Sequence, residues 1–296
     1  MCDLLAACFS KPVTALFALR GFKAKERFNS HGWGLAWYPD RSVQVVKEPV
    51  RASESRLFVT LFESVKLRSE IFIAHVRRAS DVRLALPSYM NTHPFWRELR
   101  GKAYVFAHNG SLKPGVKRTE FKGRFPLGRF KPIGGTGAEY VFCHLLDCIE
   151  RNVESWRSSE FRWLHEKLSE LNEYLFLNCA MSDGSHLFVY HDSEGYNGMA
   201  LTFRRSPFPT IQLKMDEKAV LQEVRDEGSQ GFVVATLSKR YTGKPVYLTD
   251  EEWVHLEPGE LIALKKGEIV FSSRRKPSEA TQTLGNTSSW KPSQRG

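Results

Sequence analysis

The sequence predicts an α+β fold, in which groups of β-strands are layered against separate helices. Short apolar runs bounded by turn residues dominate the chain, as is typical of strands. The runs come in groups, and helical patterning lies between the groups, which favours α+β layers over a doubly wound parallel sheet. Neither glycine-rich phosphate-binding pattern, G-x-x-x-x-G-K-[ST] or G-x-G-x-x-G, is present in the sequence, so nucleotide binding has no support.

The expected elements follow one another along the chain. Thr136-x-x-Glu139 ahead of an apolar helical run indicates a capping box, in which the Glu139 carboxylate is expected to fold back onto the backbone of Thr136. Helices are predicted at 53–67, 136–151 and 156–176, with weaker patterns at 13–20 and 215–228. Strands are predicted at 34–38, 43–46, 71–76, 103–108, 175–182, 186–191, 231–236, 260–265 and 268–271.

Length and composition are those of an ordinary globular chain. Its 296 residues, 42% of them hydrophobic, can bury a sizeable core. The chain lacks both a run of about 18 uncharged apolar residues and a signal-peptide pattern, so we expect a cytoplasmic protein without a membrane partner. The 5 cysteines have no metal-binding spacing, so neither a disulfide framework nor a metal site is expected. Three of them are expected in the core, namely Cys143, Cys148 and Cys179.

The net charge of +10 is concentrated in two segments. Residues 113–131 carry seven Lys or Arg against Glu120, and residues 274–296 carry five against Glu279. Basic loops and tails are more often solvated than functional, so nucleic acid is not expected as a partner. Residues 274–296 are also rich in Ser, Thr and Pro, which predicts a disordered tail after one domain at 2–273.

Cys2 is the first residue that suggests chemistry. Removal of Met1 would leave Cys2 with both a thiol and a free α-amine. The ordinary pKa of an α-amine, about 8, lies close to that of a thiol, so the amine can serve as the base that activates the thiol. Cys2 is therefore a candidate nucleophile.

Two stretches that follow predicted strands supply complementary groups. Asn109 and Gly110 offer an amide and an unobstructed N–H, which suit an oxyanion hole, although this Asn-Gly pair taken alone also fits a type I′ hairpin turn. Arg77 and Arg78 follow the strand at 71–76, and a guanidinium there can hold a carboxylate. Because side chains alternate along a strand, only one of the two arginines can face the site.

In combination and order, these motifs resemble the class II glutamine amidotransferases. The chain is most similar to the small stand-alone type, which includes predicted bacterial amidotransferases and the γ-glutamyl hydrolases of glutathione breakdown and ergothioneine synthesis. The resemblance runs from Cys2 to about Phe271. It rests on Cys2, GWG at 32–34, HVRRAS at 75–80, NTHPF at 91–95, HNG at 108–110, GTGAE at 135–139 and SDG at 182–184.

The resemblance implies an N-terminal-nucleophile hydrolase fold, a four-layer αββα sandwich with two antiparallel sheets face to face. It also implies a reaction without a cofactor. The Cys2 thiolate attacks the γ-amide of glutamine or of a γ-glutamyl compound, an acyl-enzyme forms, and water releases glutamate. Either an ammonia acceptor site lies on a synthase or other partner protein, or there is no acceptor and the reaction is plain hydrolysis.

The same resemblance gives each site residue a role. It makes Cys2 the nucleophile, with its α-amine as base, and it makes Asn109 and Gly110 the oxyanion hole. The substrate α-carboxylate falls to Arg77 and Ser80, because Arg77 has the spacing from Ser80 that the family arginine has. His93 and Trp33 are expected to shape the pocket.

The chain departs from the family at Gly137. The family usually has Thr-Asp-Ser-Glu where this chain has Thr-Gly-Ala-Glu at 136–139, and that aspartate normally holds the substrate α-ammonium. Loss of such a partner costs on the order of 2–5 kcal/mol. Three outcomes stay open: another acid, Asp81 or Asp183, replaces it; the substrate has no free α-ammonium; or catalysis is lost and the protein binds a ligand or partner. We also expect the 113–131 segment to border the pocket and to favour an anionic substrate.

Overall fold

The computed structural model describes residues 2–14, 30–64, 67–78, 86–206, 208, 211–212, 220–221, 228–237 and 252–275. Its helical segments are η2 (Ala52–Glu54), α2 (Arg56–Ser64), η3 (Tyr89–Asn91), α3 (Arg118–Arg124), α4 (Gly137–Asn152) and α5 (Ser158–Asn172). Its strands are β1 (Asp3–Thr14), β2 (Trp33–Trp37), β3 (Gln44–Glu48), β4 (Arg68–Val76), β5 (Phe95–Leu99), β6 (Lys102–Asn109), β7 (Asn178–Ser182), β8 (Leu187–Tyr190), β9 (Met199–Arg205), β10 (Ile211–Gln212), β11 (Val220–Leu221), β12 (Gln230–Thr236), β13 (Val254–His255), β14 (Leu261–Lys265) and β15 (Glu268–Ser272).

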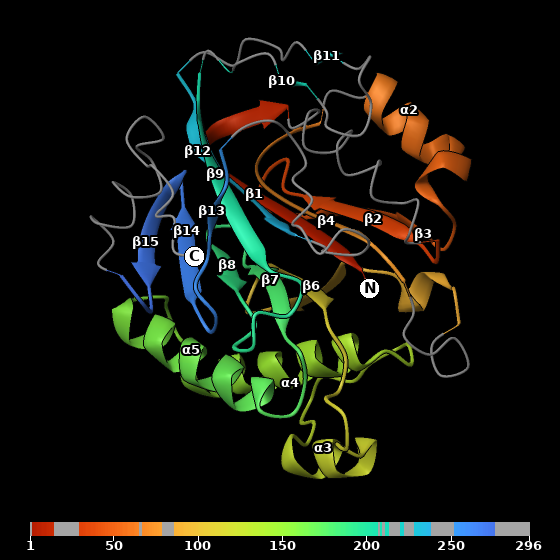
Figure 1. The fold of residues 1–296 in the computed structure, drawn as a ribbon, viewed down its shortest axis with the longest axis vertical. Helices are drawn as coiled ribbons and strands as arrows, with labels where there is room; N and C mark the ends of the chain where they lie inside the picture. The colour runs from red at the N-terminus through yellow and green to blue at the C-terminus, as the bar shows by residue number, and fades with distance from the viewer. Residues whose placement is uncertain are drawn as a thin grey trace, which may run out of the picture.

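Two antiparallel sheets form the centre of the molecule (Figure 1). One has the strand order β13-β9-β12-β1-β4-β2-β3, and the other has the order β15-β14-β8-β7-β6-β5. Between them lies a core of alternate side chains, because successive residues of a strand point to opposite faces. Even-numbered residues of β1 and odd-numbered residues of β4 and β6 supply this central core.

Helices cover the outer faces of both sheets. Phe58 of α2 packs edge-on against Trp33 of β2, with ring centroids 4.9 Å apart. On the other side, Phe142 of α4 stacks on Phe106 of β6 at 5.4 Å, and α5 packs beside it. The order helix, sheet, sheet, helix confirms the predicted αββα sandwich.

The central strand β1 is the main element that the sequence analysis does not predict. The weak helical pattern at 13–20 is wrong at Val13 and Thr14, which end this strand, and its other residues lie outside the described ranges. Residues 3–9 are all buried, so they show no polar alternation from which a strand could be identified. β5 and β9 were also not predicted, and the helical pattern at 215–228 is wrong at Val220–Leu221, which pairs with β10.

The capping box is half confirmed. Thr136 caps α4, since its hydroxyl accepts from Glu139 N at 3.2 Å. The Glu139 carboxylate, however, does not fold back onto Thr136. It pairs with Arg97 of β5 at 2.6 Å and accepts from the backbone N–H groups of Ile133 and Gly134, because a charge-assisted pair plus two hydrogen bonds outweighs the single bond to the Thr136 N–H.

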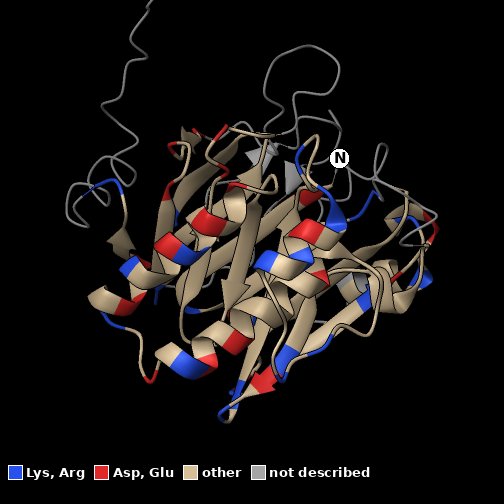
Figure 2. Cartoon of the chain, turned by 90° about the horizontal axis from the view of Figure 1, so that it is seen from below, with Lys and Arg blue, Asp and Glu red and all other residues tan. Residues whose placement is uncertain are grey.

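The 113–131 segment is not all loop, because it contains α3. In the view from below, the helices carry residues of both charges (Figure 2). Of the predicted tail, residues 276–296 lie outside the described ranges. Among the described helices, none has the length and apolarity needed to cross a membrane.

Candidate active site

The alternation of side chains along β1, β4 and β6 directs Cys2, Arg77 and Asn109 toward the same region. Cys2 continues the even-numbered face of β1, and Arg77 and Asn109 continue the odd-numbered faces of β4 and β6, so all three are directed between the sheets. β1 begins where β4 ends, since Asp3 pairs with Val76. The amide of Asn109 then joins the two sheets by donating Nδ2 to the Cys2 carbonyl oxygen at 2.5 Å.

The Cys2 thiol is half-buried and held by the backbone of Arg78. Its Sγ lies 3.2 Å from both the N and the O atoms of Arg78, as acceptor of the first and donor to the second. Burial raises the pKa of the thiol, while the Arg78 N–H and the positive charge of Arg77 act in the opposite direction. The thiol is therefore protonated at neutral pH and needs a base to become a nucleophile.

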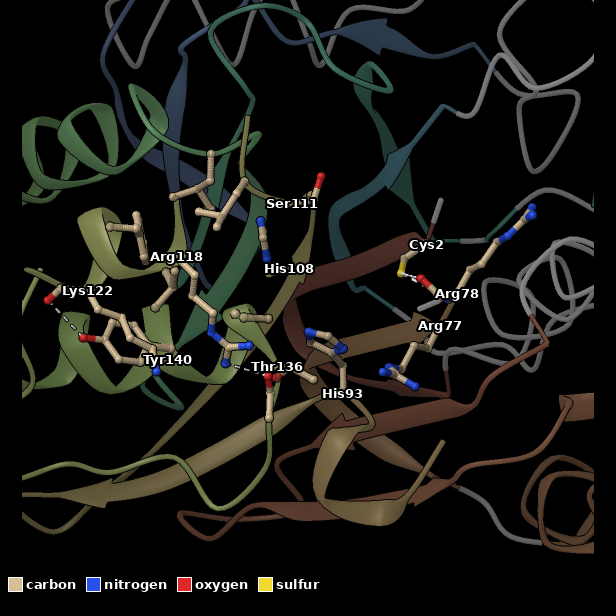
Figure 3. Close-up of a pocket in the computed structure, with 18 residues that line it drawn as sticks. Cys2, Arg77, Arg78, His93, His108, Ser111, Arg118, Lys122, Thr136 and Tyr140 are labelled. Atoms are coloured by element: carbon tan, nitrogen blue, oxygen red, sulfur yellow. Dashed lines mark hydrogen bonds between the residues drawn. The ribbon is translucent and has the colours of Figure 1, made fainter. Parts of the chain in front are cut away.

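Arg77 and Arg78 point apart, as the alternation predicts. Figure 3 shows the Arg77 guanidinium directed toward His93 and the Arg78 side chain directed away. Arg77 is buried, and its Nη1 donates to the carbonyl oxygen of His31 at 3.4 Å. Burial lowers its pKa, and a negative charge on Cys2 would raise it. Arg77 thus presents a partly desolvated cation near the thiol.

Position 110 requires glycine because the backbone of Phe176 lies very close to it. A Cβ at this position would stand 1.8 Å from the carbonyl oxygen of Phe176, so only glycine fits. The hairpin-turn alternative is wrong, because β6 pairs with the distant strand β7. The Asn109 Oδ1 accepts from Asn197 Nδ2 at 3.3 Å, which fixes the plane of the amide.

Three buried histidines surround the site in neutral form. Burial lowers the pKa of His75 to about 3 and that of His108 to about 4, and it holds the pKa of His93 well below the ordinary value. His75 donates Nε2–H to the His108 carbonyl at 3.1 Å, and His108 donates to the Phe176 carbonyl at 2.9 Å. The His93 ring packs at a tilt against His75, with ring centroids 4.1 Å apart, yet neither of its nitrogens has a hydrogen-bond partner among the described residues.

Gly34 of β2 and Lys47 of β3 position the segment that carries His93. A Cβ at Gly34 would lie 2.1 Å from the His93 carbonyl oxygen, so glycine lets the His93 segment lie against β2. Lys47 of β3 donates Nζ to the carbonyl oxygens of Thr92 at 2.7 Å and Pro94 at 3.3 Å. The second glycine of the GWG motif, Gly34, is therefore needed for the close contact between β2 and the His93 segment.

A cavity of about 310 Å³ opens beside these residues. Cys2, Arg77, His93 and Gly110 line it, as do Arg118 and Lys122 of α3 and residues 135–138 at the start of α4. In Figure 3 the cavity residues run from Cys2, past His93 and Thr136, to Lys122. The expectation that the 113–131 segment borders the pocket is confirmed for two of its basic residues.

Asp183 does not replace the acid that is missing at position 137. This carboxylate is buried at the opposite end of β7 from the site, where it pairs with Lys102 at 2.9 Å and contacts His186, so it cannot replace an acid at position 137. Asp81 and Ser80 lie outside the described residues. A Cβ at Gly137 would meet no atom within 4 Å.

Trp33 does not join the other site residues. It shares the face of β2 that packs on α2, and it is not part of the cavity lining. The sequence analysis gave no role to His108, although it lies in the HNG motif. It also missed the apolar wall, since a residue that faces a cavity has the same periodicity as one in the core. That wall comprises Leu112, Phe121, Tyr140, Val141 and Leu175.

The three cysteines that were expected in the core lie there. Cys143, Cys148 and Cys179 are buried and free. Within the described ranges, no group of three or more His, Cys, Asp or Glu side chains is placed to hold a metal ion.

Comparison with known proteins identifies the family. A family model described as "Glutamine amidotransferases class-II" matches residues 1–288. The uncharacterized protein MJ1515 of Methanocaldococcus jannaschii is 38% identical over 276 residues, which cover 93% of this chain and 72% of that protein. The crystal structure of a "predicted glutamine amidotransferase" from Pseudomonas aeruginosa PA01 is 25% identical, with a TM-score of 0.58 over 91% of this chain and 95% of the other.

A more distant structure agrees in fold. Glutamine phosphoribosylpyrophosphate amidotransferase from B. subtilis is 16% identical, with a TM-score of 0.57 over 92% of this chain and 48% of that one. The matched model spans nearly the whole sequence, and the cavity holds the cysteine, arginine and glycine of the motifs. The chain therefore belongs to the class II glutamine amidotransferases.

Proposed function

We propose that this protein hydrolyses the γ-amide of glutamine or of a γ-glutamyl compound through a thioester on Cys2. The observation that carries the proposal is the convergence of a thiol, a buried guanidinium and Gly110 at one cavity, with the Asn109 amide bonded to the backbone of Cys2. Arg77, together with Ser80, is proposed to bind the substrate α-carboxylate, since a guanidinium can pair with it through two parallel hydrogen bonds. His93 forms the wall beside it.

The proposed reaction begins with proton transfer inside Cys2. Removal of Met1, which lies outside the described residues, frees the α-amine, and this amine takes the thiol proton. The thiolate attacks the amide carbon, and the carbonyl electron pair moves to the oxygen. The Gly110 N–H and the second N–H of the Asn109 amide stabilise that oxyanion.

Collapse of the intermediate breaks the C–N bond. The leaving amine takes the proton held by the α-amine and departs, and the acyl group stays on sulfur as a thioester. Water then adds to the thioester carbon while the α-amine accepts a proton from it. The C–S bond breaks, the thiol regains its proton, and glutamate or its derivative leaves.

Intact mass after alkylation tests this proposal. We expect the purified chain to lack Met1 and to gain one adduct on Cys2 from diazo-oxo-norleucine or from its N-acetyl derivative, two electrophiles with a γ-glutamyl-like skeleton. A Cys2→Ser variant is the control and should gain none. A processed chain that gains no adduct from either probe would contradict the proposal.

One observation supports a second candidate, a site that binds its ligand without turnover. The described lining of the cavity contains no carboxylate, and the space beside Gly137 is open. In that case Cys2 would be alkylated, but no ammonia would be released from any γ-glutamyl amide. Measuring both alkylation and ammonia release separates the two candidates.

A further inference from the structure

The part of the cavity away from Cys2 is positively charged. Arg118 donates Nη2 to the Gly135 carbonyl at 3.0 Å, which places its guanidinium at the start of α4. Lys122 lies one turn further along α3, with Nζ 5.3 Å from the Tyr140 ring centroid. With Arg77, these make three cationic side chains at the described lining of the cavity, against no acidic one. Arg78 also lines the cavity, but its side chain is directed away (Figure 3).

The acids of α4 nearest to this region are committed elsewhere. Glu139 is buried and bound to Arg97 and to two backbone N–H groups. Asp147 is also buried, and it accepts from the backbone N–H groups of Gly128 and Phe130 at 2.5 and 3.1 Å. Neither carboxylate can turn toward the cavity without leaving a buried cation or buried N–H groups unpaired.

The start of α4 adds positive potential. The first N–H groups of a helix have no partner within the helix, and they carry a partial positive charge. Thr136 satisfies one of them through Glu139 N. Gly137 and Ala138 line the cavity, and the open space beside Gly137 leaves the first turn accessible from it. This geometry favours an anion.

His93 provides an independent sign of a ligand. Its ring lies between Thr136 and Arg77 in Figure 3 and lines the cavity. The residue is 4% exposed, and within the described part of the chain neither ring nitrogen has a hydrogen-bond partner. A neutral imidazole has one donor and one acceptor, and leaving both unpaired in a buried position costs free energy. A ligand with a neutral amide at this point would satisfy the ring, whereas an ammonium group would lie among cations.

We propose that the cavity binds a γ-glutamyl amide whose α-nitrogen is acylated and whose acyl group ends in a carboxylate or a phosphate. That anion binds between Arg118, Lys122 and the first turn of α4, and the acylated nitrogen lies at His93. This rests on the proposed function for the position of the glutamyl end at Cys2 and Arg77. The cavity of about 310 Å³ is at the small end of ligand pockets, so it suits a short acyl group.

Calorimetric binding to a Cys2→Ala variant tests the site without turnover. The probes are glutamine, N-acetylglutamine and N-succinylglutamine, which present at the α-nitrogen a cation, a neutral amide, and an amide with a terminal carboxylate. We expect affinity to rise in that order, with N-succinylglutamine about tenfold or more tighter than N-acetylglutamine, as for one charge-assisted contact. Glutamine binding as tightly as N-succinylglutamine, or no binding of any probe, would overturn the proposal.

Variants in the same background locate the anion. Lys122→Gln should reduce the preference for N-succinylglutamine over N-acetylglutamine. Lys117→Gln removes the same charge from the residue before α3, which does not line the cavity, and should leave the preference unchanged. Gly137→Asp places a carboxylate in open space at a helix start, where it is tolerated, and should reverse the order in favour of glutamine. Equal effects of the two lysine variants would contradict the assignment.

Ammonia release by the unsubstituted protein keeps this inference separate from the proposed function. Binding in the expected order without ammonia release from any probe would overturn the hydrolase and support the anion site. Ammonia release from glutamine at least as efficient as from N-succinylglutamine would support the hydrolase and overturn the anion site.

Discussion

Two glycines of the cavity differ in the space around them. At Gly110, a Cβ would collide with the Phe176 carbonyl and would also lie 2.7 Å from Nε2 of His108. At Gly137, it would meet nothing within 4 Å. The first glycine is required by packing of the backbone, and the second is not required by its surroundings.

Substitution by alanine should therefore destabilise the fold at position 110 and leave it nearly unchanged at position 137. Gly110→Ala should lower the free energy of unfolding by about 1–3 kcal/mol, as overpacking does, and should abolish alkylation of Cys2. Gly137→Ala should change it by less than about 0.5 kcal/mol and leave alkylation intact. Urea denaturation and adduct mass measure both effects. Equal losses in the two variants would show that the close approach at Gly110 is not a constraint.

The sequence could single out Cys2, Arg77 and Gly110 as candidates, because their chemistry is specific and their spacing resembles a family pattern, and the structure brings all three to one cavity. It could not assign Trp33 to a face of its strand, since that depends on which side of β2 meets α2. Nor could it show that Asp183 is held by Lys102 far from the site, because that contact joins two distant turns.

At the level of elements, α4 is attached to the sheet by one buried ion pair. Glu139 in its first turn is almost fully buried, and Arg97 of β5 is mostly buried. The same carboxylate accepts from the loop that precedes the helix. The position of the cavity wall at the start of α4 therefore depends on this carboxylate.

Glu139→Gln should destabilise the fold by about 3–5 kcal/mol, because it leaves the Arg97 cation partly buried and unpaired. Glu150→Gln breaks the more exposed pair with Arg129 and should cost about 0–1 kcal/mol. Urea denaturation of the two variants gives the comparison. Similar losses would mean that the Glu139 pair is effectively solvated.

Helix α4 and strand β1 show which elements a sequence can predict. The predicted helix at 136–151 agrees with α4 to within a residue, because Thr136 marks its start and an apolar stripe of helical period follows. β1 is buried on both faces and so shows no period of two. Such a strand becomes recognisable only when the neighbours that cover each face are known.

For the molecule as a whole, the resemblance to the family predicts the layers correctly, since the αββα arrangement comes with the motifs. The sequence predicts only that the 113–131 segment borders the pocket. It does not predict how α3 and the start of α4 pack around the cavity, because that packing depends on loops with no regular pattern. The sequence does not show the protonation state of the histidines where the two sheets meet, because burial lowers their pKa values. They make the stability of the whole fold depend on pH.

Stability should fall as the solution becomes acidic. In the folded protein the pKa values of His75 and His108 are about 3 and about 4, and that of His93 is also below the ordinary value of histidine. At a pH between the folded and the ordinary pKa, these histidines bind protons only in the unfolded chain. Their contribution is present above about pH 6.5 and is lost as the pH falls toward the folded values. Each contributes a slope of up to about 1.4 kcal/mol per pH unit.

Urea unfolding at several pH values between neutral and about 4.5 measures this slope. His75→Gln should reduce it by about the share of one histidine, whatever the absolute stability of the variant. A free energy of unfolding that stays constant over this range would contradict the prediction.

The pairing of β1 determines how early during synthesis the sheet around Cys2 can be completed. Cys2 precedes a strand that pairs with β4 on one side and with β12 on the other, where Leu5 lies opposite Ala235. The sheet around the thiol can close only after β12 has left the ribosome. We therefore expect the pocket around Cys2 to be completed only late in synthesis, after β12 has paired with β1.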